Sequence, residues 1–221
     1  MKRLIVKKDL LPSIKNEQKF INAIQLSRIL GTLHFNKIIL SKMDKENNLN
    51  PGIQLYLLLN HAAVLYEGIK GFKRLEAKLK NLESYNENYD KIEKISREIE
   101  DKGSFYNKVF CEISNKIAFH YDKGDIKEIF KTYVDDCSRE HGDVILISGK
   151  TRVLKDANYA LADNMNIHYV LKSIKGKNLS DRDKFVIMAK ELLSMSKLFC
   201  EILEEVIPEL IQGYCELKKD T

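Results

Sequence analysis

One short stretch, SNKIAFHYD, holds the residues best suited to chemistry, and it runs from Ser114 to Asp122. The preceding residues have the three- and four-residue apolar spacing of a helix, and His120 continues the buried side of that helix. An imidazole can accept or donate a proton near neutral pH. The same pattern also fits a helix end in which His120 and Tyr121 pack against neighbours and Asp122 caps the next turn. Both interpretations stay open.

The stretch resembles a motif of HEPN-like helical proteins, in which an arginine followed four to six residues later by a histidine marks a metal-independent RNase site. The match runs from Asn115 to Asp122, and Ser114 stands where the family pattern has arginine. The resemblance implies that His120 is a general acid or base, that Asn115 contacts a phosphate or ribose, and that the chain forms a homodimer. Serine offers neither the charge nor the bidentate fork of a guanidinium. We therefore expect an RNA-associated or partner-bound protein with impaired catalysis.

A second group of polar residues lies on otherwise apolar helices: Arg28, His61, Glu67, Asp163, Asn164 and His168. Buried polar groups need partners, so we expect several of them to meet inside the bundle, together with His120. An Arg28 that reached His120 from another helix would replace the missing arginine. The alternative is an ion-pair network that fixes the register of the helices. The sequence does not decide whether Arg28, Glu67, Asp163, His168 and His120 form one site.

The spacing of these residues argues against a metal centre or a cofactor site. His61 and Glu67 stand six positions apart on one helix, so their side chains point in different directions. No glycine-rich loop follows a strand, and no nucleophile elbow occurs. We predict no metal and no cofactor, and whether the chain is an enzyme stays open. The alternatives are a non-enzymatic structural or interaction bundle and, less favoured, a metal-dependent helical hydrolase acting on nucleotides.

The composition predicts the fold class. The chain has 221 residues with only 3 prolines and 10 glycines, which favours long helices joined by short connections. We expect one all-α domain over residues 1–221, a bundle of about six or seven helices, with an extended arm at residues 1–12 and a small β ribbon near residues 144–147. The helices are expected at about 14–43, 53–82, 84–101, 104–120, 125–139, 152–174 and 180–217, the last with a bend at Pro208.

Within the expected helix 14–43, the apolar spacing predicts one face directed to the core, with Gly31 as a point of close helix packing. The residues expected on that inward face are Ile14, Ile21, Ile24, Leu30, Leu33 and Ile38.

Charge and cysteine usage bear on partners and compartment. The net charge of +5 is too small to imply an anionic partner, and the lysine clusters are typical of helix surfaces. The 4 cysteines show no CxxC spacing, which indicates free thiols in a reducing compartment. Polar residues interrupt the longest apolar run, residues 53–69, so we expect no membrane span. Without an export signal, the prediction is a cytoplasmic protein whose protein partner is unknown.

Overall fold

The computed structural model describes residues 3–6, 11–46, 51–118, 127–129, 131–132, 134–135, 160–172, 174, 179–212 and 215–218. Within these ranges the chain is almost wholly helical, so the predicted all-α class is confirmed. The described part alone holds ten helices, more than the six or seven expected, because several expected helices are divided by turns or changes of helix type.

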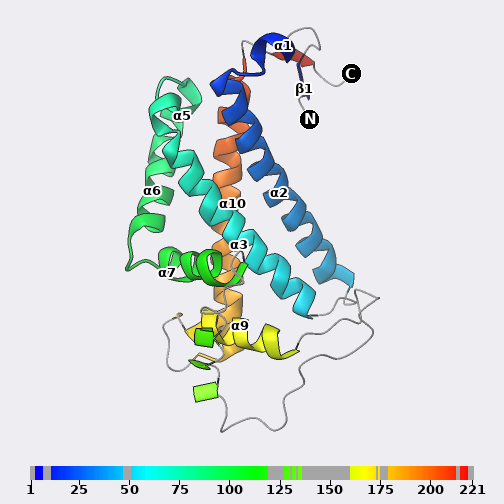
Figure 1. The fold of residues 1–221 in the computed structure, drawn as a ribbon, viewed down its shortest axis with the longest axis vertical. Helices are drawn as coiled ribbons and strands as arrows, with labels where there is room; N and C mark the ends of the chain where they lie inside the picture. The colour runs from blue at the N-terminus through cyan, green and yellow to red at the C-terminus, as the bar shows by residue number, and fades with distance from the viewer. Residues whose placement is uncertain are drawn as a thin grey trace.

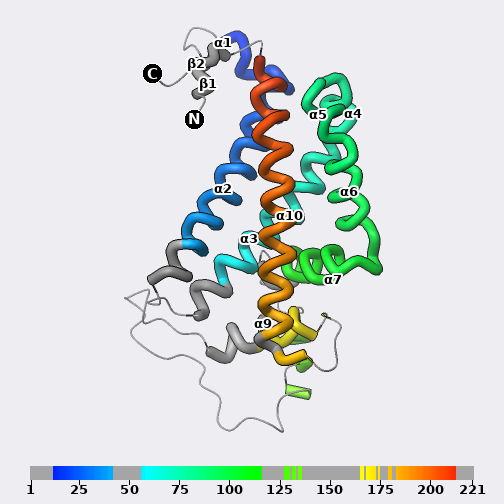
Figure 2. The backbone as a smooth tube through the Cα atoms, turned by 180° about the vertical axis from the view of Figure 1, so that it is seen from behind, coloured from blue at the N-terminus to red at the C-terminus, as the bar shows by residue number. Residues whose placement is uncertain are grey.

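Three long helices form the centre of the bundle: α2 (Gln18–Glu46), α3 (Pro51–Arg74) and α10 (Asp181–Leu210). Figure 1 shows α3 crossing in front of α10, with α2 along one edge, and Figure 2 shows α10 running most of the length of the molecule. Proline is suited to the first position of α3, where no helical N–H bond is needed. The side chain of Ser180 caps α10 by accepting from the backbone N–H of Asp183.

Shorter helices cover the opposite side of α3 from α2. They are α4 (Glu76–Leu79), α5 (Glu83–Glu87), α6 (Tyr89–Glu100), α7 (Phe105–Glu112) and the π-helix η2 (Ile113–Ala118). Ser104 caps α7, as its position before the apolar run suggests. Helix α9 (Ala160–Lys172) packs near the start of α10, and α1 (Leu11–Ile14) precedes α2.

One hydrophobic core joins these elements. Leu26 and Leu33 of α2, Leu65 of α3 and Leu192 and Leu203 of α10 are wholly buried in it. Each of the three long helices therefore contributes its own apolar stripe to the same interior, as ridges of packed helices require.

The two ends of the described chain pair in a small ribbon. Strand β1 (Arg3–Val6) runs antiparallel to β2 (Cys215–Lys218), with Arg3 opposite Lys218. The expected helix up to residue 217 is therefore wrong: α10 ends at Leu210, where Ile211 leaves the helical conformation, and Cys215–Lys218 is a strand. Within the expected extended arm at residues 1–12, residues 3–6 form β1 and the helix Leu11–Ile14 begins before the arm ends. The ribbon expected at residues 144–147 lies outside the described residues.

Candidate functional site

The described part of the motif, residues 114–118, lies on η2, which packs against α3. The side chain of Ser114 is buried at 2% exposure, and its hydroxyl donates to Oε1 of Glu67 at 3.2 Å. The same carboxylate pairs with Nζ of Lys70 at 3.1 Å. Ser114 is thus directed into the bundle and engaged, whereas a phosphate-binding group would have to reach solvent.

The other two predicted site residues are placed differently. Asn115 is exposed, and its amide donates to Sγ of Cys111, in the last turn of α7, at 3.0 Å. Arg28 is exposed on α2. His120 lies outside the described residues, so its catalytic role and its distance from Arg28 stay predictions.

Arg28 and Glu67 do share one feature, a groove of about 540 Å³ between α2 and α3 that Arg74 also lines. Gly68 forms part of this groove, and a Cβ there would lie 2.7 Å from Cγ2 of Ile29. The two helices therefore almost touch beneath the groove, and only glycine permits this approach. Of the second polar group, the structure brings Arg28 and Glu67 to one groove, with Ser114 bound to Glu67 from η2.

His61 takes no part in that groove. It is wholly buried on α3, and its Nε2 lies 2.8 Å from Oγ of Ser196 on α10. Burial, and to a smaller degree the positive charge of Lys37, lowers the pKa of His61 to about 4. A neutral, inaccessible imidazole stabilises the contact between α3 and α10 and cannot serve a substrate.

The remaining members of the group do not add a ligand set. The side chains of Asp163 and Asn164 lie outside the described residues, and His168 is half-buried on α9. Among the side chains that the structure describes, no three His, Cys, Asp or Glu residues come close enough together to hold a metal ion. In the same part of the chain, no helix has the length and apolar character needed to cross a membrane.

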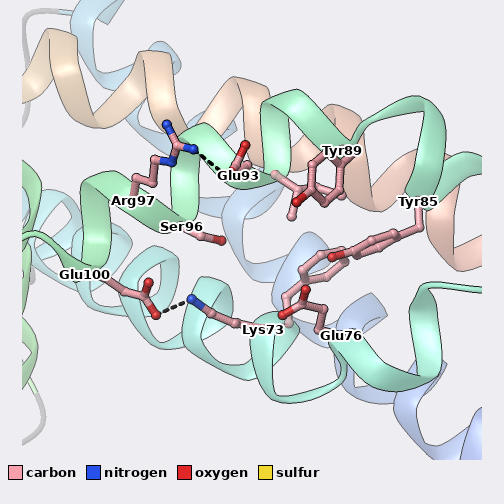
Figure 3. A pocket seen from close by; sticks show the side chains of 10 residues that line it. Lys73, Glu76, Tyr85, Tyr89, Glu93, Ser96, Arg97 and Glu100 are labelled. Carbon is pink, nitrogen blue, oxygen red and sulfur yellow. Dashed lines mark hydrogen bonds and ion pairs between the residues drawn. The ribbon is translucent and has the colours of Figure 1, made fainter.

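A second hollow, of about 320 Å³, lies between α3–α4 and α5–α6. Figure 3 shows its two charged pairs, Lys73 with Glu100 and Arg97 with Glu93, the latter at 2.6 Å. Each cation of the lining is thus matched by a carboxylate, which leaves little attraction for an anionic ligand.

Tyrosines form one wall of this hollow (Figure 3). Burial, followed by the neighbouring carboxylate of Glu76, raises the pKa of Tyr85 to about 12. The phenol therefore stays protonated at neutral pH and cannot act as a base.

The most unusual surface is an exposed apolar side of α2, part of which was predicted to face the core. Ile21, Ile24, Phe35 and Ile38 of α2 are 42%, 50%, 61% and 50% exposed, so the prediction that Ile21, Ile24 and Ile38 face inward is wrong. Gly31 also faces open space, since a Cβ there would meet nothing within 4 Å, and it is not the expected packing point. The buried stripe of α2 instead contains Ala23, Leu26 and Leu33 on the other side of the helix.

We call this solvent-facing stripe the α2 outer face and define it by six residues: Ile21, Ile24, Arg28, Gly31, Phe35 and Ile38. Their alternating three- and four-residue spacing keeps them in one line along the helix. Figures 1 and 2 show α2 at the edge of the bundle, with α3 and α10 on its inner side. The spacing is evident in the sequence and predicts an apolar stripe. Because α2 carries two such stripes, the sequence does not show which of them is buried in the core.

Comparisons of the chain with protein-family models, with curated proteins and with solved structures find no match.

Proposed function

We propose that the chain is a non-enzymatic helical interaction protein and that it binds its partner through the α2 outer face. The observation that carries this proposal is the row of four large apolar side chains exposed on the side of α2 opposite the core. A helix at the surface of a protein normally turns polar residues to solvent. Contiguous apolar patches with a polar rim are typical of interaction sites.

The dimensions fit a partner helix. The face extends over 17 helical steps from Ile21 to Ile38, which is about 26 Å at 1.5 Å per residue. Helix-binding surfaces present anchors at three- and four-residue spacings in this manner. The α2–α3 groove, lined by Ile21, Ile24 and Arg28 as well as by residues of α3, widens the surface on one side.

The chemistry of the described residues supports the non-enzymatic part. Ser114 supplies no positive charge at the position of the motif arginine, and its hydroxyl is bound to Glu67. The only histidine that is fully buried in the described part of the chain, His61, is bound to Ser196. The homodimer implied by the HEPN-like resemblance is one form that such an interaction can take.

A photo-crosslinking residue placed at the face tests this proposal without knowledge of the partner. Phe35 is replaced by benzoylphenylalanine, and Val186, an exposed residue of α10 at 41%, by the same residue as a control. We expect a discrete adduct at position 35 in the cells that produce the protein, none at position 186, and loss of the adduct when Ile24→Asp is added. No adduct at position 35, or equal adducts at both positions, would refute the proposal.

RNA association is a second candidate function, which one observation favours. Arg28 and Arg74 line the α2–α3 groove, and neither forms an ion pair within the described residues. Two unpaired guanidinium groups beside a groove suit a phosphate backbone. Fluorescence anisotropy with labelled RNA tests this candidate: affinity should fall with rising salt and weaken in Arg28→Gln. A salt-independent signal, or none, would remove RNA from consideration.

A further inference from the structure

We infer that the partner of the α2 outer face is a second copy of this chain, packed against it with its α2 antiparallel. This inference rests on the proposed function. The spacing along the face is 3, 4, 3, 4 and 3 residues, which reads the same from either end. A twofold axis between Arg28 and Gly31 would therefore match the face with itself, as an isologous interface requires.

The residues that this axis brings together are complementary. Ile21 meets the partner's Ile38, and Ile24 meets the partner's Phe35, so apolar side chains that are 42% to 61% exposed cover one another. Each such pair occurs twice, because the two copies contribute it reciprocally. The arrangement buries all four large apolar residues of the face, with none left over.

The remaining pair places Arg28, which has a long side chain, opposite the partner's Gly31, which has none. Gly31 has no atoms within 4 Å of its Cβ position, so it leaves a depression in the middle of the face. The antiparallel axis places the partner's Arg28 over that depression. The aliphatic stem of an arginine can lie along an apolar surface while its guanidinium reaches water at the rim. The charge in the centre of the face is thereby accommodated without burial.

The flanks of the face do not repel a second copy. Gln25, Ser27 and Thr32 are uncharged, and His34 is already engaged with Glu204 at 3.2 Å. Flanking positions of a helix pair are those where like charges prevent association and opposite charges select a different partner. A face whose own flanking residues are uncharged or already paired suits an identical neighbour.

The expected affinity is modest. A contact of about 26 Å between two helices, widened by the α2–α3 groove, is smaller than the roughly 800 Å² per partner of a standard interface. We expect a dimer with a micromolar dissociation constant. Aromatic anchors dominate such interfaces and Phe35 occurs twice in the dimer, so Phe35→Asp should raise the dissociation constant at least about 100-fold.

Sedimentation velocity from about 1 to about 200 µM measures the association. The parent and the control Val186→Asp should show a dimer whose fraction rises with concentration, while Phe35→Asp stays monomeric. If the parent is monomeric throughout while position 35 still forms an adduct with another protein, the second copy is refuted and the interaction face stands. If the parent is monomeric and position 35 forms no adduct, both the dimer and the interaction face are refuted.

Cysteine cross-linking then tests the direction. Ile21→Cys and Ile38→Cys are prepared separately, and the parent, with its native cysteines, gives the background. In the antiparallel dimer, position 21 lies beside the partner's position 38, but the two copies of position 21 are about 26 Å apart, far beyond disulfide reach. Mild oxidation should therefore give a disulfide dimer only when the two variants are mixed. A disulfide in each variant alone would show a parallel pair and overturn the inference.

Discussion

The buried His61 makes the contact between α3 and α10 sensitive to acid. Its pKa is lowered from 6.5 to about 4, first by burial and then by Lys37, whereas the unfolded chain keeps the ordinary value. The unfolded state therefore binds the proton more readily, and stability is complete above pH 6.5 and declines as the pH falls toward 4. At about 1.4 kcal/mol per pH unit, full protonation in the unfolded state alone reduces the free energy of unfolding by about 3 kcal/mol.

Urea unfolding followed by circular dichroism, from about pH 7.5 to about pH 4.5, measures this loss. His61→Gln removes the titrating group and keeps a polar side chain that can reach Ser196. Both proteins carry Phe35→Asp, so that association does not contribute. We expect the stability advantage of histidine over glutamine at this position to shrink by about 2 to 3 kcal/mol across this range. Parallel pH profiles for the parent and the His61→Gln variant would refute the reasoning.

Two further predictions concern packing at long range. Burial raises the pKa of the Glu209 carboxyl, but hydrogen bonds from Ser84 and from the backbone of α5 outweigh burial, so the pKa is lowered in the folded protein. The ionised carboxylate therefore stabilises the fold at pH values above the pKa of the unfolded chain. This stabilisation is lost as the pH falls through the pKa of the folded protein. Glu209→Gln should cost about 1 kcal/mol at neutral pH and less in acid, as urea titrations at both pH values will show. Gly68→Ala should lower the free energy of unfolding by about 1 to 3 kcal/mol, because the added methyl group would lie 2.7 Å from the Ile29 side chain. The control Gly71→Ala, whose Cβ would have its nearest contact at 3.7 Å, should raise it by up to about 1 kcal/mol. Equal thermal shifts for the two glycine variants would contradict this.

Local signals in the sequence predicted much of the fold. The scarcity of proline and glycine predicted helices, and Ser104 and Ser180 stand at N-caps because a serine oxygen can accept the free N–H groups of a first turn. On α6 the three isoleucines at three- and four-residue spacing, Ile92, Ile95 and Ile99, are buried. In each case the information lies within one or two turns of the residue concerned.

Contacts between segments that are distant in the sequence could not be predicted from such local patterns. The N-terminus of α5 has no side-chain cap of its own, and Glu209 supplies one by accepting from the backbone N–H groups of Glu83 at 2.7 Å and Ser84 at 2.8 Å. These residues are more than a hundred positions apart, so only the folded chain unites them. The pairing of β1 with β2 was hidden for the same reason.

The candidate site shows the same limit. Arg28 and Glu67 were noticed as polar residues on apolar helices, and Ser114 as the residue at the arginine position of the motif. The sequence could not show that Glu67 binds Ser114 or that Arg28 and Glu67 line the same groove. The sequence also could not show which of the two apolar stripes of α2 is buried in the core. A stripe with three- and four-residue spacing predicts burial against some helix, and it does not specify whether that helix belongs to the same chain.

A single charge explains why the α2 outer face would accept one alignment of a second copy. In a parallel pair, Arg28 would face the partner's Arg28, which brings like charges together, and Gly31 would face Gly31, which leaves a gap. An antiparallel pair shifted by one heptad would place Arg28 against the partner's Ile24 or Ile38 and leave apolar residues at the ends uncovered. Only the axis between Arg28 and Gly31 pairs every isoleucine and phenylalanine while the arginine meets an empty position. Arg28→Leu should therefore strengthen association and also loosen its register, because apolar residues alone would tolerate several alignments. Self-disulfides in Ile21→Cys that form only when Arg28→Leu is present would show that parallel pairs become populated once the charge is removed, and their absence would show that the apolar pairs alone exclude the parallel alignment.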